Sequence, residues 1–445
     1  MSGQVVVIGA GGDMCSVAVR RLAAHAPGVG LILTDLRPEP VQRLAASLGP
    51  GRATVGTLDL FDARALRERI RGAALVILGA GPFMRTAEPV LEACIAEGVD
   101  YLDFDDDTAS TDAALARDGA VRRAGIAAYI GAGASPGLTN VMARDAASQL
   151  DELDTLDVAW CSGDEGPKGH APAVIEHLVH AFGGPVPSWR DGRRVDVEAF
   201  ADSEIVDLGG DLGPFRLYEC GHPESVTLPR RYPDARRIRV LGGFHPQPTN
   251  GMVRGVSAAV IDGRLTMREA VEFFTDVLQD GSGTPRGWRW ALRGIAGQAL
   301  RREESVRSIA GFLGQGLRKQ HPAWRGGIVC RATGRIDGAP ASVVRRFACP
   351  SGGRTWTSMA AVTGHCVAAF AVLALEGRGT EAGVLCPEDW VEPQALYAAM
   401  QRLGAAPSDL VESPEQLPRV AAAGARADGP TSTGRPAGAP AVSPL

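Results

Sequence analysis

The chain is poor in lysine, with only Lys168 and Lys319 among its 445 residues, so arginine carries almost all of the positive charge. Its formal net charge is -5. A weakly acidic chain lacks the basic surface that nucleic acids and anionic membranes bind, so neither is expected as a partner. Arginine, alanine, glycine and proline are abundant throughout, so an isolated glycine motif in this chain is weak evidence.

The 8 cysteines include no C-x-x-C pair and no spacing typical of metal ligands. No apolar run approaches the roughly 20 residues that a membrane-spanning helix needs. Scattered cysteines in a chain of this length are typical of reduced, buried thiols. No basic, then apolar, targeting segment is seen at the N-terminus. We therefore expect a soluble, cytoplasmic protein.

A length of 445 residues exceeds what one hydrophobic core usually supports, which favours two or three domains. Up to about residue 130, short apolar runs alternate with segments of helical period. Such alternation predicts an α/β fold, a Rossmann-type doubly wound parallel sheet. The expected strands are 5–8, 31–34, 74–78, 101–104 and 126–130, with a weaker one at 53–58. The expected helices are 14–24, 38–48, 63–70, 87–97 and 112–124.

The region that follows mixes strand-like runs, turn clusters and a few helices, which predicts an α+β second domain. Residues 326–349 are typical of a β-hairpin, with two β-rich arms around Asp337 and Gly338. Two further helices are expected, one in the segment "TGHCVAAFAVLAL" with Thr363 as its N-cap, and one at 393–402. The last residues, rich in proline, alanine, glycine and serine, predict a disordered tail.

The stretch "VVVIGAGGDM" indicates a dinucleotide-binding turn, because Gly9 and Gly11 follow a strand and precede a helix. Gly9 permits the tight turn, Gly11 lets the backbone approach a pyrophosphate, and Gly12 adds freedom nearby. The helix that begins near Asp13 directs unpaired N–H groups at that anion. Met14 stands where a third glycine is usual, and that glycine serves helix packing rather than phosphate binding.

An acidic residue at the end of the second strand, Asp35, is placed to accept hydrogen bonds from the adenosine ribose and to repel a 2′-phosphate. This favours NAD. Arg37 is placed to bind that phosphate, so NADP stays open. Alternatively, Asp35 only caps its strand and Arg37 is only solvated. The other residues assigned to the cofactor are Leu36, Asp59, Gly79, Ala80, Gly81 and Pro82, although Gly81 and Pro82 are equally typical of an ordinary turn.

Several longer stretches resemble the saccharopine dehydrogenase (saccharopine reductase) family, which includes the carboxynorspermidine dehydrogenases. They are "VVVIGAGGDM", "GPFMRTAEPVLEACIAEGVDYLDFDDD", "GAGASPGLTNVMARDAA", "GHPESVTLPR" and "MAAVTGHCVAAFAVLAL". The resemblance implies an NAD(P)-dependent oxidoreductase acting on the CH–NH bond of an amino-acid-derived secondary amine or imine. Met14 departs from the family pattern, and so does Ser135, which stands where many relatives carry aspartate.

The resemblance also implies the domain plan, with boundaries that we place from the sequence. Residues 1–135 would bind NAD(P), and 136–355 would form an inserted substrate domain that often makes a homodimer interface. Residues 356–410 would return to the Rossmann domain as helices, and 411–445 would be the tail.

The candidate catalytic residues are Asp103, which ends the fifth strand, and the pair His222 and Glu224. Histidine titrates near neutral pH and suits proton transfer. Arginine binds carboxylates in a two-pronged manner. The candidate substrate-binding residues are Arg85, Asp105, Ser135, Asn140, His170, Arg230 and Thr363. Each has a purely structural alternative; in particular, acids at the end of "YLDFDDD" are typical of a helix N-terminus.

No metal is expected, although His170, His177 and His180 lie close in the sequence, because no accompanying carboxylate or cysteine completes a zinc pattern. His177 and His180 are instead expected to face solvent or substrate. Two other functions stay open. One is an NAD(P)-dependent reductase of a C=O or C=C bond, and the other is a nucleotide-binding scaffold without turnover.

Overall fold

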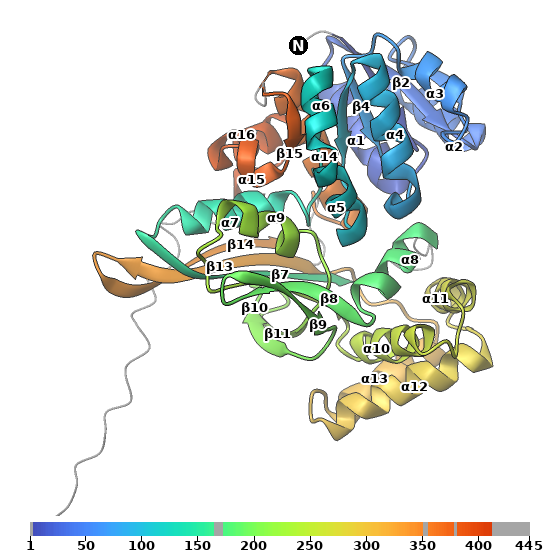
Figure 1. Cartoon of the computed structure of the whole chain (residues 1–445). Coiled ribbons are helices and arrows are strands. Elements are labelled where there is room, and N and C mark those ends of the chain that lie inside the picture. The colour runs from blue at the N-terminus through green and yellow to red at the C-terminus, as the bar shows by residue number, and fades with distance from the viewer. Residues whose placement is uncertain (1–2, 164–171, 350–354, 378–380, 412–445) are drawn as a thin grey trace, which may run out of the picture.

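The computed structural model describes residues 3–163, 172–349, 355–377 and 381–411 (Figure 1). His170 and most of the expected tail lie outside these residues. Among the described residues, no helix is both long and apolar enough to cross a membrane.

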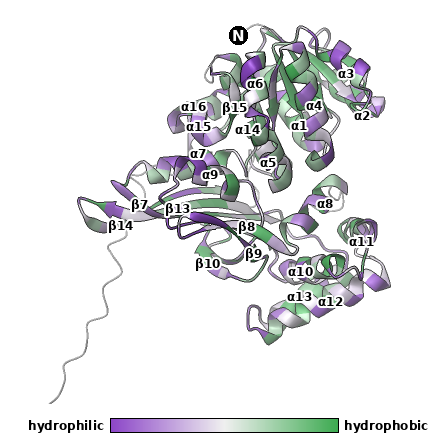
Figure 2. Ribbon diagram, in the orientation of Figure 1, coloured by the Kyte–Doolittle hydropathy of each residue, from purple (hydrophilic) through white to green (hydrophobic). Residues whose placement is uncertain are grey.

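A parallel sheet of 7 strands, in the order β15-β6-β5-β4-β1-β2-β3, forms the upper part of the molecule in Figure 1. The central strands contain runs of valine, isoleucine and leucine that helices cover on both faces, so Val5 to Ile8 and Leu75 to Leu78 are buried. Figure 2 shows these strands in green, the colour of hydrophobic residues. The predicted doubly wound sheet is confirmed. Its strands are β1 (Gly3–Ile8), β2 (Val29–Asp35), β3 (Ala53–Thr57), β4 (Leu75–Leu78), β5 (Asp100–Asp103), β6 (Ala127–Tyr129) and β15 (Gly383–Leu385).

The crossover helices of this sheet agree with the sequence prediction except at two places. They are α1 (Asp13–His25), α2 (Pro38–Leu48), α3 (Ala63–Ile70), α4 (Phe83–Glu97), α5 (Thr108–Ala116) and α6 (Asp118–Ala124). The helix expected at 87–97 begins at Phe83, directly after Pro82. The single helix expected at 112–124 is two helices that meet at Arg117, and the first begins early because the Asp107 carboxylate accepts the N–H groups of Ala109 and Ser110.

The C-terminal helices α14 (Met359–Leu375), α15 (Pro387–Trp390) and α16 (Pro393–Arg402) lie beside this sheet, followed by a short 3-10 helix, η1 (Pro407–Asp409). Helix α14 is buried nearly all round, which explains its unbroken apolar composition. The prediction of Thr363 as its N-cap is wrong. The helix begins a turn earlier, where the Ser358 hydroxyl accepts the Ala361 N–H group at 3.0 Å.

The second sheet has the strand order β10-β11-β12-β7-β13-β14, and β8 joins it through β12 and carries β9. The predicted hairpin is confirmed, because β13 and β14 pair in antiparallel register around Asp337 and Gly338, both at positive φ. The strands are β7 (Glu152–Gly163), β8 (Pro185–Arg190), β9 (Arg193–Glu198), β10 (Ser203–Asp207), β11 (Pro214–Glu219), β12 (Arg237–His245), β13 (Gly326–Ile336) and β14 (Ala339–Cys349).

Seven helices accompany the second sheet, more than its sequence suggested. Helices α7 (Leu138–Ala147) and α9 (Glu224–Arg231) lie between the two sheets, and α8 (Pro172–Ala181) lies at one end (Figure 1). The other four form a helical layer below: α10 (Pro248–Ile261), α11 (Met267–Asp280), α12 (Pro285–Leu300) and α13 (Val306–Leu317). Glycines make the contact between α10 and α12 close, since a Cβ atom on Gly294 would overlap the Gly251 carbonyl oxygen.

Candidate active site

The glycine-rich loop after β1 is shaped to hold a dinucleotide. Gly9 has φ of 80°, and a Cβ atom there would lie 2.7 Å from the Ala80 nitrogen. The Gly11 N–H group donates to Asp35 Oδ2 at 3.1 Å, and helix α1 begins two residues later. The loop therefore combines a tight turn, a helix N-terminus and an acid at the end of β2, the parts that bind pyrophosphate and ribose.

The residues around Asp35 leave the choice between NAD and NADP open. Asp35 Oδ1 also accepts the Arg37 N–H group at 3.0 Å, so the carboxylate does cap its strand while it lies beside the glycine loop. Leu36 is 66% exposed. Asp59 accepts the N–H group of Phe61 at 2.9 Å and thereby closes the turn after β3.

Close helix packing explains both Gly79 and the missing third glycine. A Cβ atom on Gly79 would overlap Cys15 Sγ, so this glycine brings α1 close to β4. On the other side of α1, a Cβ atom on Gly364 would overlap the Met14 carbonyl oxygen. Helix α1 thus packs closely because the segments that contact it carry glycines, Gly79 and Gly364. A glycine at position 14 is not needed for this packing, and the Met14 side chain faces a cavity.

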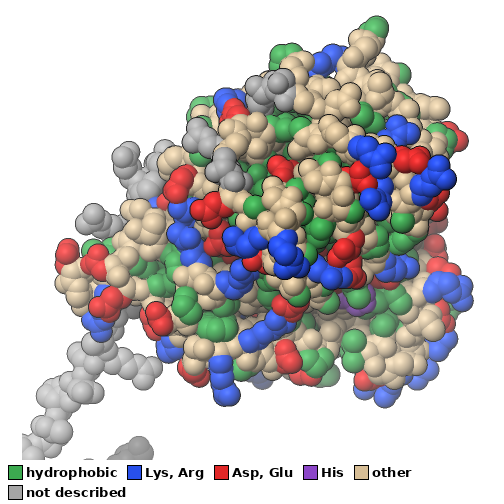
Figure 3. All heavy atoms as spheres, turned by 45° about the horizontal axis from the view of Figure 1, so that its top comes forward, with side chains coloured by type: hydrophobic (Ala, Val, Ile, Leu, Met, Phe, Trp, Pro, Cys, Tyr) green, Lys and Arg blue, Asp and Glu red, His purple; other side chains and the backbone are tan. Residues whose placement is uncertain are grey.

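That cavity, of about 500 Å³, lies between the nucleotide-binding part and the helices α8 and α10–α13. Figure 3 shows histidine, in purple, beside hydrophobic side chains in green at the seam between the two parts. From the side of the first sheet the cavity is lined by Met14, Phe104, Asp106, Gly133, Ala134, Ser135 and Thr363. Ligands of open α/β sheets bind at this carboxyl edge of the strands.

A buried group of hydrogen-bonded side chains stands at the cavity wall. His222 Nδ1 and Glu224 Oε2 are 2.8 Å apart, and both side chains are almost fully buried. The hydroxyls of Ser135 and Thr139 both donate to Glu224 Oε1 at 2.6 Å. Glu224 is thus held by α7 and the turn before it, and Ser135 and His222 line the cavity.

Charge pairing fixes the protonation of these two groups. Burial disfavours the imidazolium of His222, but the facing Glu224 carboxylate outweighs burial and raises the pKa of His222. Burial alone would raise the pKa of Glu224. The charge of His222 and the hydroxyl donors lower it by more, so the pKa of Glu224 lies below its usual value. Both shifts favour the ion pair, an imidazolium facing a carboxylate, over the two neutral forms.

Two more titratable groups, Asp106 and His177, lie against this pair. His177 Nδ1 is 3.4 Å from Asp106 Oδ1, and the rings of His177 and His222 have centroids 5.5 Å apart. Burial and the nearby His222 lower the pKa of His177 to about 3, so this imidazole is neutral. Burial raises the pKa of Asp106 to about 6. Ligand atoms of Asp106, His177 and His222 all lie within 4.8 Å, a set that can also bind a divalent cation.

Several predicted site residues instead serve the structure of the domain junction. Asp103 accepts the N–H groups of Gly131 and Asp105 at 2.7 and 3.1 Å, and burial raises its pKa to about 6. Asp105 accepts the N–H group of Asp107 at 2.8 Å. Neither lines the cavity.

Asn140 is also internal. Its side chain accepts the Gly137 N–H group and donates to Thr227 Oγ1 and Glu388 Oε2, at 2.9, 3.0 and 2.9 Å. The buried carboxyl of Glu388 has its pKa raised by burial to about 7.

The two arginines expected to bind a substrate carboxylate do not line the cavity. Arg85 is largely exposed and pairs with Glu176 of α8 at 3.0 Å. The Arg230 guanidinium lies 4.0 Å from Cys386 Sγ, on the side of α9 that faces β15.

Sequence reasoning assigned no role to Asp106 or Thr139 in the site, and left His177 between solvent and substrate. Asp106 was attributed to the helix N-terminus, a role that Asp107 takes. Nothing in the local sequence signals that Thr139 and Glu224 meet across 85 positions.

Comparison with known proteins supports the resemblance of the nucleotide-binding part. Residues 5–129 match the family model described as the saccharopine dehydrogenase NADP binding domain. The N-terminal part is a saccharopine dehydrogenase-type nucleotide-binding domain. The predicted resemblance and a nicotinamide dinucleotide as cofactor are thereby confirmed.

Two curated relatives extend this saccharopine dehydrogenase-type similarity. The chain is 25% identical over 53% of its length to carboxyaminopropylagmatine dehydrogenase of Synechocystis sp., covering 61% of that protein. It is 32% identical over 38% of its length to carboxynorspermidine synthase of Vibrio cholerae, covering 43% of that protein. The matched regions thus span about three fifths and less than half of these relatives.

The fold of the described residues is similar to that of a solved saccharopine dehydrogenase. The apo, L-Glu-forming enzyme of Saccharomyces cerevisiae superposes with a TM-score of 0.59 at 16% identity. The superposition covers 90% of this chain and 97% of that one, so the second sheet and the C-terminal helices share the fold.

Proposed function

We propose that this protein is an NAD(P)-dependent oxidoreductase acting on the CH–NH bond of an amine or imine. One observation carries the proposal: Met14 and Ser135 on the cofactor side line the same cavity as His222, which pairs with the buried Glu224. When bound, the cofactor supplies or accepts the hydride. The names of the two curated relatives support an amine substrate.

The remaining tasks are proton transfer and orientation of the substrate, and we assign them to four titratable side chains: Asp106, His177, His222 and Glu224. Oxidation of a secondary amine begins with loss of its ammonium proton; His177, with a pKa of about 3, is too weak a base to take this proton and is suited instead to hydrogen-bond the neutral nitrogen. The imidazolium of His222, held by Glu224, repels a cationic nitrogen and attracts a carboxylate or carbonyl oxygen. Asp106, with a pKa of about 6, is suited to carry a proton between solvent and the reacting nitrogen.

The Asp35 carboxylate beside Gly11 favours NAD, since a 2′-phosphate there would be repelled, while Arg37 supports NADP. We propose NAD as the preferred cofactor. The substrate is proposed to be derived from an amino acid.

The test is cofactor turnover with paired substrates. Purified protein is mixed with NADH or NADPH, an amino acid or amine, and a keto acid or aldehyde, and nicotinamide absorbance is followed. Each carbonyl is also offered alone. The proposal expects oxidation of the reduced cofactor only when amine and carbonyl are both present.

The apolar lining of the cavity favours a second candidate, a reductase of a C=O or C=C bond in a hydrophobic molecule. Turnover of a carbonyl or an alkene without any amine would support this candidate against the first. If the protein binds NAD(H) tightly but turns over no amine, carbonyl or alkene, the result would favour a nucleotide-binding scaffold without catalytic activity.

A homodimer in a reducing, cytoplasmic compartment completes the proposal. β14 is an edge strand of the second sheet, with half-buried Val343 and Val344, and is a candidate for the contact between copies. All 8 cysteines are buried and form no disulfide, as expected where thiols stay reduced. Light scattering coupled to gel filtration tests the dimer.

A further inference from the structure

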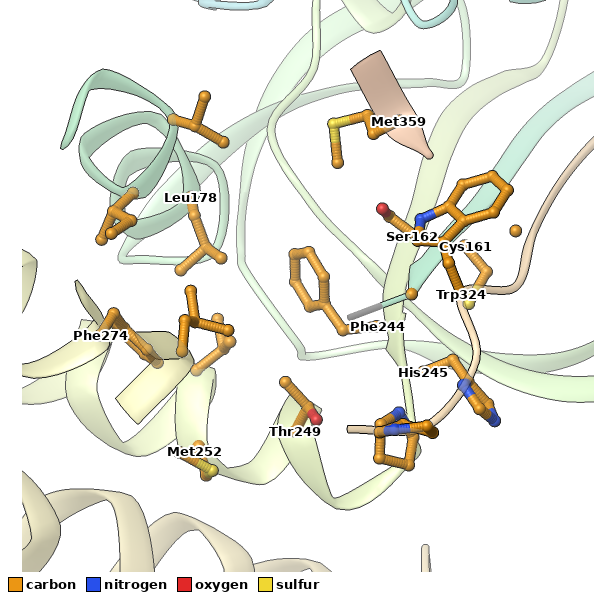
Figure 4. A pocket seen from close by; sticks show the side chains of 18 of the residues that line it. Cys161, Ser162, Leu178, Phe244, His245, Thr249, Met252, Phe274, Trp324 and Met359 are labelled. Carbon is orange, nitrogen blue, oxygen red and sulfur yellow. The ribbon is translucent and has the colours of Figure 1, made fainter. Parts of the chain in front are cut away.

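The wall of the cavity away from the cofactor loop is predominantly apolar. Its side chains come from α8, α10, α11, α12 and α13 and from the ends of β7 and β12. They are Trp160, Val174, Ile175, Leu178, Phe182, Phe244, Met252, Val253, Phe274, Val277, Leu278, Trp288, Leu292, Phe312, Leu313, Leu317 and Trp324. Figure 4 shows Phe244 between Leu178 and Phe274 on one side and Ser162 and Trp324 on the other.

Positive charge is nearly absent from this wall. Among the described residues that line the cavity there is no arginine, and the only lysine is the exposed Lys319. Arg85 and Arg230 lie elsewhere. A substrate with several carboxylates would lose its hydration in the cavity and find few cationic partners among the described lining residues beyond His222 and the exposed Lys319, which is unfavourable.

A few polar atoms in this wall remain available to a ligand. Trp160 Nε1, Ser162 Oγ and Trp324 Nε1 are buried and have no hydrogen-bond partner among the described residues. They suit one or two polar groups on a molecule that is otherwise hydrocarbon. A few placed polar groups in an apolar pocket of this size are typical of sites for small hydrophobic ligands.

The cavity opens to the surface through helices α12 and α13. Leu292 and Leu317 line it and are nevertheless 45% and 88% exposed. A long apolar molecule thus has an entrance at which Leu292 and Leu317 are exposed.

We infer that the substrate carries a large apolar body, which fills the cavity between α8 and α10–α13 while its reacting nitrogen lies at His177 and Asp106. The inference rests on the proposed function for the identity of the reacting group. It adds the substrate class: a hydrophobic amine or imine rather than a polar amine with several carboxylates.

The experiment uses N-alkylglycines with chains of increasing length, and a matched series ending in a second carboxylate. Binding to the full-length protein with oxidised cofactor is followed through tryptophan fluorescence, because Trp160, Trp288 and Trp324 line the cavity. We expect Kd to fall about fourfold for each added methylene, the ratio for complete transfer of one methylene from water. The carboxylate-ended series should bind weakly at every length.

Two leucines of α12 provide the matched variants. Leu292 lines the cavity, whereas Leu300 does not and is 85% exposed. Leu292→Glu should weaken binding of the longest alkyl chain at least tenfold, and Leu300→Glu should leave it unchanged. Both positions are exposed, so both variants should fold, and thermal unfolding checks this.

The outcomes separate the inference from the proposed function. Binding that tightens with chain length without cofactor reduction would support the inference and contradict the CH–NH activity. Turnover that is independent of chain length, or better with the second carboxylate, would overturn the inference and leave the activity standing. Equal effects of the two leucine variants would also overturn it.

Discussion

The substitution Glu224→Gln tests the electrostatic core of the site. It keeps the size of the side chain and its ability to accept the hydroxyls of Ser135 and Thr139, but removes the charge that faces His222 at 2.8 Å. Burial, which lowers the pKa of His222, is then no longer offset by the charge of Glu224. We expect the pKa of His222 to fall from above its usual range to below it.

The size of the change follows from the distance. An opposite charge in direct contact shifts a pKa by about 1–3 units, and each unit corresponds to about 1.4 kcal/mol. His222 should therefore be neutral at pH 7 in the variant. Catalysis that uses the imidazolium should then lose activity at neutral pH and regain part of it at lower pH.

Stability should follow the same charges. The raised pKa of His222 stabilises the fold below the unfolded value of about 6.5, and this contribution is lost as pH rises through the folded pKa. The lowered pKa of Glu224 stabilises above the unfolded value of about 4.3, and that contribution is lost as pH falls through the folded pKa. The pair contributes most between the two, and Glu224→Gln should abolish this maximum.

Histidine NMR titration measures the effect directly, with the His222 signal assigned by its absence in His222→Asn. Glu219→Gln is the matched control, since Glu219 is equally buried but pairs with Arg190, 2.6 Å away. If His222 titrates identically in the wild type and in Glu224→Gln, the assignment of an ion pair is wrong.

Three further predictions concern the cofactor, the helix contact and a buried ion pair. Asp35→Ser should improve NADP binding relative to NAD by about tenfold or more, measured by titration of each cofactor, because it removes a charge that repels the 2′-phosphate. Gly364→Val should lower the free energy of unfolding by about 1–3 kcal/mol through its clash with α1, whereas Gly311→Ala, in open space within α13, should raise it by up to about 1 kcal/mol. Asp157→Asn should cost about 1–3 kcal/mol in chemical unfolding, because it removes the buried charge that pairs with Arg237, Arg239 and Arg331, while Arg239 keeps Asp202 and Glu204. The arginines around Asp157 hold its pKa low despite burial, so this contribution should be present above the unfolded pKa of about 3.9 and disappear as pH falls through the folded pKa.

Local patterns predicted the nucleotide-binding part closely. The limits of α2, α3 and α16 agree with their helical periods, because each is bounded by signals within a few residues, such as Pro38 or Pro393. The prediction of Thr363 as the N-cap of α14 failed because a helix that is buried on all sides has no alternation of apolar and polar residues to mark its first turn. The true cap, Ser358, lies five residues earlier.

The candidate site was predicted in part. His222, Glu224, Ser135 and Met14 were singled out, and all four lie at or beside the cavity. Asp103 and Arg230 have residue types that suit the chemistry, yet their side chains bond within the protein or lie outside the cavity. Residue type alone does not tell a buried structural carboxylate from a reactive one.

The sequence by itself determined the cofactor loop and the parallel sheet, because both depend on contacts between neighbouring positions and on the alternation of apolar and polar residues. Only the tertiary structure decided what faces the reacting group. Asp106, His177 and His222 come from three separate segments, and the apolar wall is assembled from helices up to 150 residues apart in the chain. This arrangement depends on how the helical layer packs against the second sheet, and the sequence of any one segment does not predict that packing.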